Sequence, residues 1–102
     1  MDKVYSAEEI KQLLQPVFKT NPVYSAVLFG SYAKGTATPQ SDVDIVIDSR
    51  GQLLNIDFYG VLEEISERLN KTVDLFELAE IHKPSQIYNR IQYEGVTIYD
   101  GA

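Results

Sequence analysis

The residues best suited to chemistry are two aspartates on alternate positions, Asp42 and Asp44, at the start of an apolar run. In a strand such residues face the same side, about 7 Å apart along the chain, so both carboxylates project together. Asp74, in another apolar run, offers a third carboxylate, and Glu77 and Asp48 are weaker alternatives for that role. Carboxylate oxygens suit Mg²⁺, which usually binds one or two of them together with substrate phosphates. The pattern predicts a metal site formed by Asp42, Asp44 and Asp74; carboxylates that merely decorate the exposed side of a strand are the simpler alternative.

A second apolar run leads directly into Gly30 and Ser31. Glycine lets a phosphate approach the backbone, and the free N–H groups of a following helical turn can bind it. The Ser31 hydroxyl adds a donor, and an ordinary strand-end turn is the alternative for this pair. Lys34 is a candidate for neutralising phosphate charge, a plain surface lysine being equally compatible, and Ser41 is a further nucleotide-binding candidate. Carboxylates beside such a turn predict metal-assisted phosphoryl or nucleotidyl transfer.

The elements that must position these residues follow from periodicity and caps. Ser6 and Glu9 are typical of a capping box, and the helix that follows contains Pro16, which is expected to kink it or to begin a new turn. We expect strands at 23–29, 42–48, 72–76 and 96–99, a short helical turn at 31–34, and helices from 6 to about 20, from 53 to 69 and from Pro84 to the stop at Gly95. This order predicts an α/β or α+β fold with a mixed sheet, in a single domain over residues 1–102.

Composition restricts the class of protein. The chain has 102 residues, no cysteine and a net charge of −6, with 9 basic residues among 15 acidic ones. Binding to nucleic acid depends on basic residues that neutralise phosphates, so direct nucleic-acid binding is not expected. A basic protein partner fits better, although an acidic surface kept for solubility is the simpler explanation. No apolar run is long enough for a membrane span, and Met1 to Val4 lack the features of a signal peptide, so we expect a cytoplasmic protein without membrane contact.

Other residues carry weaker signals. His82, the single histidine, is expected at the surface rather than in catalysis. Tyr88, Arg90 and Tyr93 share the last predicted helix. Because aromatic residues are enriched at interfaces, this helix is a candidate docking face.

The spacing of these motifs resembles a known family. Gly30-Ser31, ten intervening residues and then Asp42-Val43-Asp44 are similar to the signature of the polymerase-beta-type nucleotidyltransferase superfamily. The tight form Gly-Ser-Tyr-Ala-Lys-Gly followed by Ser-Asp-Val-Asp-Ile, in a chain near one hundred residues, resembles the minimal nucleotidyltransferase (MNT) group. The resemblance covers nearly the whole chain. Lys34 occupies a position that is often arginine in the family, so the charge is kept but the forked geometry is lost.

The resemblance implies a fold, a site and a partner. It implies a mixed sheet flanked by helices, with Asp42, Asp44 and Asp74 holding two Mg²⁺ ions and with Gly30 and Ser31 holding the nucleotide phosphates. MNT proteins are typically encoded beside a HEPN-domain toxin as its antitoxin. The MNT member can silence the toxin by transferring AMP from ATP onto a toxin tyrosine.

The leading hypothesis is therefore an Mg²⁺-dependent nucleotidyltransferase that uses ATP and modifies a hydroxyl, expected to be a tyrosine, of a HEPN toxin. One alternative is an antitoxin that neutralises its toxin by binding alone. Another is a small-molecule nucleotidyltransferase of the antibiotic-modifying kind that acts as a dimer. A chain of 102 residues leaves little room for an acceptor-binding domain, so a homodimer or a hetero-oligomer with the toxin is expected to complete the site.

Overall fold

The computed structural model describes residues 3–101; Met1 and Asp2, which enter the signal-peptide prediction, and Ala102 lie outside the described residues. The elements follow one another as α1 (Ala7–Lys19), β1 (Ser25–Phe29), α2 (Ser31–Lys34), β2 (Val43–Asp48), α3 (Ile56–Leu69), β3 (Val73–Glu77), the 3₁₀ turn η1 (Leu78–Glu80), α4 (Gln86–Glu94) and β4 (Val96–Asp100). Every helix within this range is too short or too polar to cross a bilayer.

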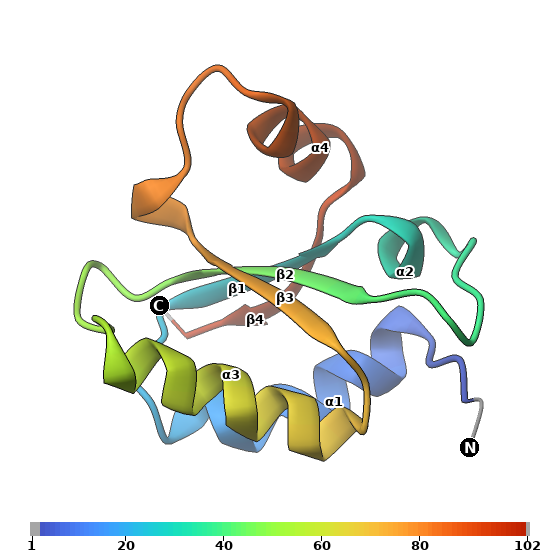
Figure 1. Cartoon of the computed structure of the whole chain (residues 1–102), viewed down its shortest axis with the longest axis horizontal. Coiled ribbons are helices and arrows are strands. Elements are labelled where there is room, and N and C mark those ends of the chain that lie inside the picture. The colour runs from blue at the N-terminus through green and yellow to red at the C-terminus, as the bar shows by residue number, and fades with distance from the viewer. Residues whose placement is uncertain (1–2, 102) are drawn as a thin grey trace.

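The sheet has four strands in the order β3-β2-β1-β4, so β4 lies at an edge. β2 runs parallel to β3, whereas β1 is antiparallel to both β2 and β4, which confirms the mixed sheet. The parallel pair is joined by α3, which crosses below the sheet beside α1, whereas α4 lies on the opposite face (Figure 1). The two faces of the sheet are therefore covered unequally.

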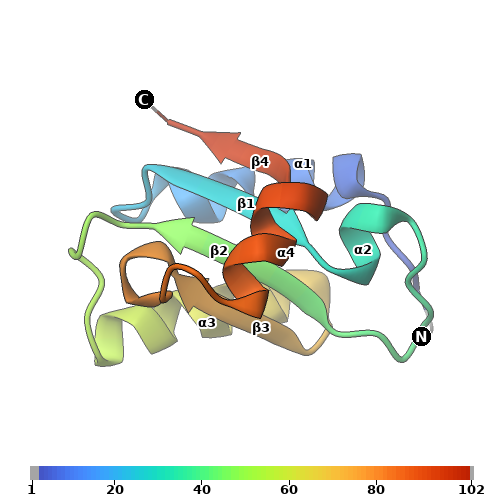
Figure 2. The same ribbon diagram turned by 90° about the horizontal axis from the view of Figure 1, so that it is seen from above.

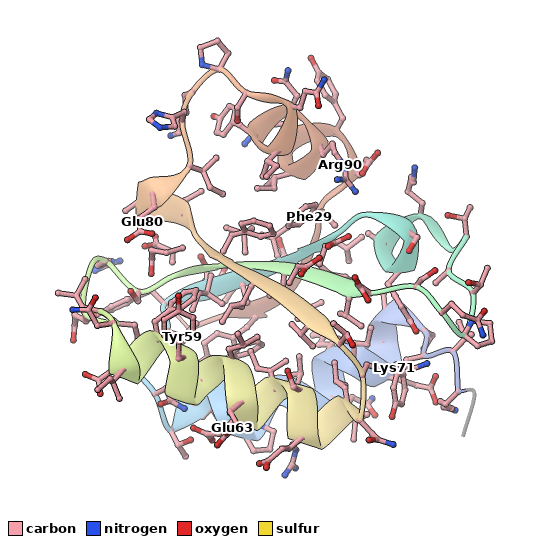
Figure 3. The ribbon with its side chains drawn as sticks, in the orientation of Figure 1. Phe29, Tyr59, Glu63, Lys71, Glu80 and Arg90 are labelled. Atoms are coloured by element: carbon pink, nitrogen blue, oxygen red, sulfur yellow. The ribbon has the colours of Figure 1, made fainter. Side chains whose placement is uncertain are left out.

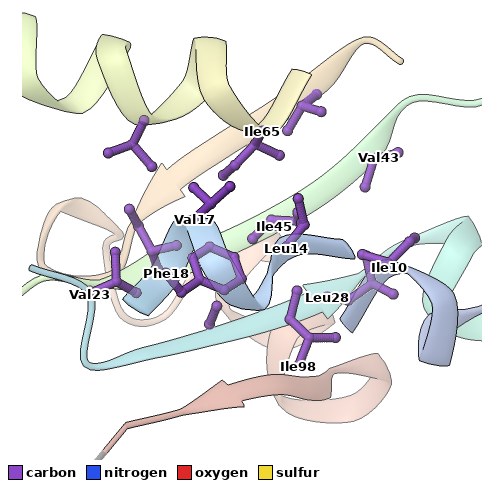
Figure 4. Packing of buried hydrophobic residues seen from close by; sticks show 14 of the residues in the cluster. Ile10, Leu14, Val17, Phe18, Val23, Leu28, Val43, Ile45, Ile65 and Ile98 are labelled. Atoms are coloured by element: carbon purple, nitrogen blue, oxygen red, sulfur yellow. The ribbon is translucent and has the colours of Figure 1, made fainter. Parts of the chain in front are cut away.

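The main core lies between the sheet and the pair α1 and α3. Val43, Ile45 and Ile47 of β2 are fully buried and point into it, as the alternation of a strand requires. Helical residues such as Leu14 and Ile65 meet them there (Figure 4). The residues between, Asp44 and Val46 among them, must then face α4.

The face under α4 carries a smaller apolar cluster. Its buried members are Phe29, Val46 and Ile91, with Phe76 and Ile87 packed against them. α4 crosses above the strands in the view from above (Figure 2). This second cluster holds α4 over the same face of the sheet that carries Asp44.

Local signals set most element boundaries. The capping box is present, since the Ser6 hydroxyl accepts a hydrogen bond from Glu9 N at 3.1 Å and Glu9 Oε1 accepts one from Ser6 N at 2.8 Å. Pro16 lies inside α1, which runs on to Lys19. Pro84 does not begin the last helix: α4 starts at Gln86, because the Ser85 hydroxyl accepts a hydrogen bond from Tyr88 N and acts as its cap. The helix predicted from residue 53 likewise starts later, at Ile56, and η1 was not predicted.

Candidate active site

Asp44 and Asp74 are brought together by the parallel pairing of β2 and β3. The register places Asp44 opposite Asp74, one step beyond the pair Val43 and Val73. Across the antiparallel pair, Phe29 lies opposite Asp44. Phe29, Asp44 and Asp74 therefore form a row across three strands, on the face that α4 covers.

Asp44 is held in an environment that disfavours its negative charge. Burial raises the pKa of this carboxyl to about 6, and the nearby charge of Asp74 acts in the same direction. The guanidinium of Arg90 opposes these effects, whereas the charge of Asp42 adds to them. A cation placed between Asp44 and Asp74 would relieve this repulsion, because opposite charges favour the ionised carboxylate.

Gly30 lies directly against the Asp44 carboxylate. Its backbone has φ 74° and ψ −155°, a conformation open to glycine but strained for other residues. A Cβ atom on Gly30 would lie 2.2 Å from Asp44 Oδ2, so no larger residue fits without moving that carboxylate. The turn α2 begins at the next residue, Ser31, and ends at Gly35, where φ is 76°. The glycine thus lets the backbone of this turn approach the carboxylates, as a phosphate-binding turn requires.

The remaining nucleotide-binding candidates, Ser31, Lys34 and Ser41, lie around this turn and make different contacts. Ser31 is half-buried at the first position of α2. Lys34 Nζ is half-exposed and pairs with Glu94 Oε2 at 3.5 Å. Ser41 Oγ accepts a hydrogen bond from Thr38 N at 2.9 Å, so its hydroxyl stabilises the loop before β2.

Asp42 is exposed and precedes the first residue of β2. Among residues 3–101, no group of three or more acidic, histidine or cysteine side chains is arranged closely enough to hold a metal ion. The structure thus pairs Asp44 with Asp74, but Asp42 does not complete a three-carboxylate metal site with them. Two adjacent carboxylates still fit Mg²⁺, which completes its coordination with water and substrate phosphates rather than with a full protein cage.

The alternatives considered for the third carboxylate lie elsewhere. Glu77 is 5% exposed at the far end of β3, where its carboxylate accepts hydrogen bonds from the hydroxyl and the N–H of Ser49. Asp48, at the far end of β2, accepts a hydrogen bond from Arg50 N at 2.9 Å. Of these three carboxylates, Asp74 is the one that lies opposite Asp44.

Arg90 of α4 reaches this site, although the sequence suggested only a docking face for it. Its Nη2 lies 3.8 Å from Asp44 Oδ2 and its Nε lies 3.6 Å from Glu94 Oε1. Its guanidinium also lies 5.5 Å from the centre of the Phe29 ring (Figure 3). The i,i+4 spacing of Arg90 and Glu94 is visible in the sequence, but the contact with Asp44 depends on how α4 packs on the sheet.

Comparisons with known proteins identify the family of this chain. Residues 7–96 match the family described as Nucleotidyltransferase domain. A Methanocaldococcus jannaschii protein provisionally named a protein adenylyltransferase is 33% identical over 91 residues, which cover 88% of this chain and 95% of that protein. Protein adenylyltransferase MntA of Shewanella oneidensis is 32% identical over 78 residues, covering 76% of this chain and 54% of MntA.

Solved structures share the fold. A toxin–antitoxin structure with AMP-PNP aligns with a TM-score of 0.75 at 24% identity, over 88% of this chain and 73% of that one. A tri-AMPylated Shewanella oneidensis HEPN toxin in complex with its MNT antitoxin aligns with a TM-score of 0.69 at 20% identity, over 92% and 72% of the two chains. The family model covers residues 7–96, most of the chain. The chain therefore belongs to the nucleotidyltransferase domain family and is an enzyme of that class.

Proposed function

We propose that this protein is an antitoxin that transfers AMP from ATP to a tyrosine hydroxyl of a partner HEPN toxin, with Mg²⁺ as cofactor. The observation that carries the proposal is the pairing of Asp44 with Asp74 directly against the Gly30 turn. The relatives named protein adenylyltransferases support a protein acceptor, and the structural neighbours that contain HEPN toxins support the choice of partner.

The residues of the chain have distinct roles in this reaction. The backbone of Gly30 and Ser31 binds the nucleotide phosphates, and Lys34 offsets part of their charge. The acceptor oxygen forms a bond to the α-phosphorus, the bond between the α- and β-phosphates breaks, and pyrophosphate leaves. Asp74 takes the proton of the attacking hydroxyl, since it is the more exposed member of the carboxylate pair.

Asp44 and Asp74 would hold Mg²⁺, with Asp42 as a further ligand. When bound, Mg²⁺ neutralises charge that develops on the phosphates and polarises the reacting groups. The chain itself contributes position: the strand register fixes the two carboxylates, and the glycine turn brings the phosphates to them.

The test is the intact mass of a HEPN protein encoded beside this gene, after incubation with this chain, ATP and Mg²⁺. We expect the wild type to add mass in AMP units, at a tyrosine. Asp44→Asn should transfer AMP at least about a hundredfold more slowly, because loss of one positioned charged group lowers the rate by roughly that factor. Asp57→Asn, in the exposed first turn of α3, is the matched control and should transfer normally.

Two other results would redirect the assignment. A stable complex of the two proteins without added mass would contradict catalysis and favour neutralisation by binding. Adenylylated aminoglycosides in a parallel assay, with an unmodified HEPN protein, would favour a small-molecule acceptor.

A further inference from the structure

A chain of charged groups links α2, α4 and β2 above the carboxylate pair. Lys34 of α2 pairs with Glu94 Oε2 at 3.5 Å, and Glu94 Oε1 lies 3.6 Å from Arg90 Nε on the same helix. The other end of the Arg90 guanidinium lies 3.8 Å from Asp44. Glu94 thus stands between two cations, and both cations border the turn that begins at Gly30.

Arg90 lies at the turn itself. Its Nη2 would be 3.1 Å from a Cβ atom on Gly30, a position that also lies 2.2 Å from Asp44 Oδ2. The guanidinium is therefore beside the backbone to which the phosphates are assigned. Two further contacts fix it there: the Phe29 ring below and Glu94 on the next turn of α4.

The donors of Arg90 are not used up by these contacts. A separation of 3.8 Å from Asp44 is longer than a hydrogen bond, so this ion pair leaves the Nη atoms able to donate elsewhere. The side chain is 47% exposed, so a ligand can reach it. A guanidinium presents a planar fork of N–H groups that matches two phosphate oxygens.

The site also requires a cation at this point. Asp42, Asp44 and Asp74 bring three carboxylates to one end of the sheet, in a chain whose net charge is −6. A nucleoside triphosphate is itself strongly anionic, so one or two bound metal ions leave charge to be offset. Both Lys34 and Arg90 contact Glu94. Arg90 is the better placed of the two, because its guanidinium also lies beside Asp44 and the Gly30 backbone.

We propose that Arg90 is a phosphate-binding residue of the nucleotide site and that Glu94 positions it. The proposal rests on the function proposed above and adds a residue from α4 to a site otherwise built from the sheet and α2. α4 then does more than cover the small apolar cluster: it carries part of the substrate pocket.

The test is isothermal titration calorimetry with Mg²⁺ and AMP-PNP, which reports binding without transfer. Loss of a charged hydrogen-bonding partner in Arg90→Gln should weaken binding roughly tenfold to a hundredfold. Arg90→Lys should lie between wild type and Arg90→Gln, because it keeps the charge without the fork. Arg50→Gln is the matched control: Arg50 stacks on the Tyr24 ring at 4.0 Å beyond the far end of β2, and its loss should leave binding unchanged.

Thermal unfolding of each variant separates binding from packing. If Arg90 only attaches α4 to the sheet, Arg90→Gln will unfold at lower temperature yet bind AMP-PNP like wild type below that temperature, which would overturn the inference and leave the proposed function intact. Should Arg90→Gln not fold, wild-type affinity in the folded Arg90→Lys variant would likewise overturn the inference, because the guanidinium fork would then contribute nothing to binding. Failure of the wild type itself to bind AMP-PNP would overturn both the inference and the proposed function.

Discussion

At the scale of single residues, Gly30 joins backbone geometry to chemistry. Replacement by alanine would place a Cβ atom 2.2 Å from Asp44 Oδ2 in a backbone conformation that side chains rarely adopt. We expect Gly30→Ala to lower the free energy of unfolding by about 1–3 kcal/mol from backbone strain and to displace the Asp44 carboxylate, with loss of transfer. Urea denaturation and the transfer assay measure the two effects.

Gly60→Ala is the matched control for that substitution. Gly60 lies inside α3, and an added Cβ atom would meet nothing within 4 Å. Alanine should raise stability there by about 0.5–1 kcal/mol, because it restricts the unfolded chain and favours helix. Equal stability of the two variants would show that the Gly30 turn is not constrained as described.

Asp44 is expected to reduce the stability of the metal-free protein at neutral pH. Its pKa of about 6 in the folded chain lies above the ordinary 3.8, so the folded state binds this proton more tightly than the unfolded state does. The contribution of Asp44 to stability is therefore fullest below pH 4 and is lost as the pH rises through 6. In a chelator, Asp44→Asn should consequently unfold at a higher temperature than wild type at pH 7.5, with the difference shrinking toward pH 4.

The control for this pH dependence is Glu63→Gln. Glu63 is exposed on α3, so its replacement should change stability by less than about 0.5 kcal/mol at either pH. Added Mg²⁺ should stabilise the wild type and narrow its difference from Asp44→Asn. If Asp44→Asn were instead less stable than wild type at pH 7.5 in chelator, the ion pair of Asp44 with Arg90 would stabilise the folded protein by more than burial and carboxylate repulsion destabilise it.

At the scale of elements, helix boundaries could be predicted from the sequence where the residues that set them are neighbours in the chain. The capping box of α1 and the ends of α2 at Lys34 and of α3 at Leu69 depend on local signals, and the structure contains each of them as predicted. Ser85 was missed as the α4 cap because Pro84 is an equally good local signal for a helix start.

Contacts between distant elements set the limit of prediction at the site. Asp44 and Asp74 could be proposed together because apolar strands joined by a crossover helix tend to pair in parallel. The reach of Arg90 to Asp44 could not, since it follows from the apolar packing of Ile87 and Ile91 on the sheet. Amphipathic periodicity shows that a helix packs on something, but not which face of the sheet receives it.

The parallel pair β2 and β3 is joined at its far end by a buried polar contact. The Ser49 hydroxyl donates to Glu77 and accepts a hydrogen bond from Leu53 N at 3.2 Å. Ser49→Ala leaves the buried carboxylate of Glu77 with fewer donors and should lower the free energy of unfolding by about 1–3 kcal/mol. Urea denaturation checks this value.

Transfer by Ser49→Ala should stay near the wild-type rate well below its unfolding temperature, because Glu77 lies at the opposite end of β3 from Asp74. Ser25→Ala, at the half-buried start of β1, controls for loss of a serine hydroxyl and should be nearly neutral in both assays. Loss of transfer in a stable Ser49→Ala protein would instead give Glu77 a role in the reaction.

At the scale of the whole molecule, the two faces of the sheet bury apolar clusters of different size, and the site lies on the face with the smaller cluster. The face under α1 and α3 holds the larger cluster. Among residues 3–101, the cluster under α4 has Phe29, Val46 and Ile91 as its buried members. Local opening costs least where few apolar groups are buried. α4 should therefore open more readily than the central strands, although it carries Arg90.

This difference predicts a pattern of amide hydrogen exchange. Without nucleotide, amides of α4 should exchange faster than those of β1 and β2, because opening α4 exposes only the smaller cluster. With Mg²⁺ and AMP-PNP, α4 should gain protection, since phosphates held by Arg90 join the helix to the turn at Gly30. The same ligand should protect α4 much less in Arg90→Gln at matched saturation, with α1 as the internal reference in each sample. Equal protection of α4 in the two proteins would mean that nucleotide binding and the docking of α4 are independent.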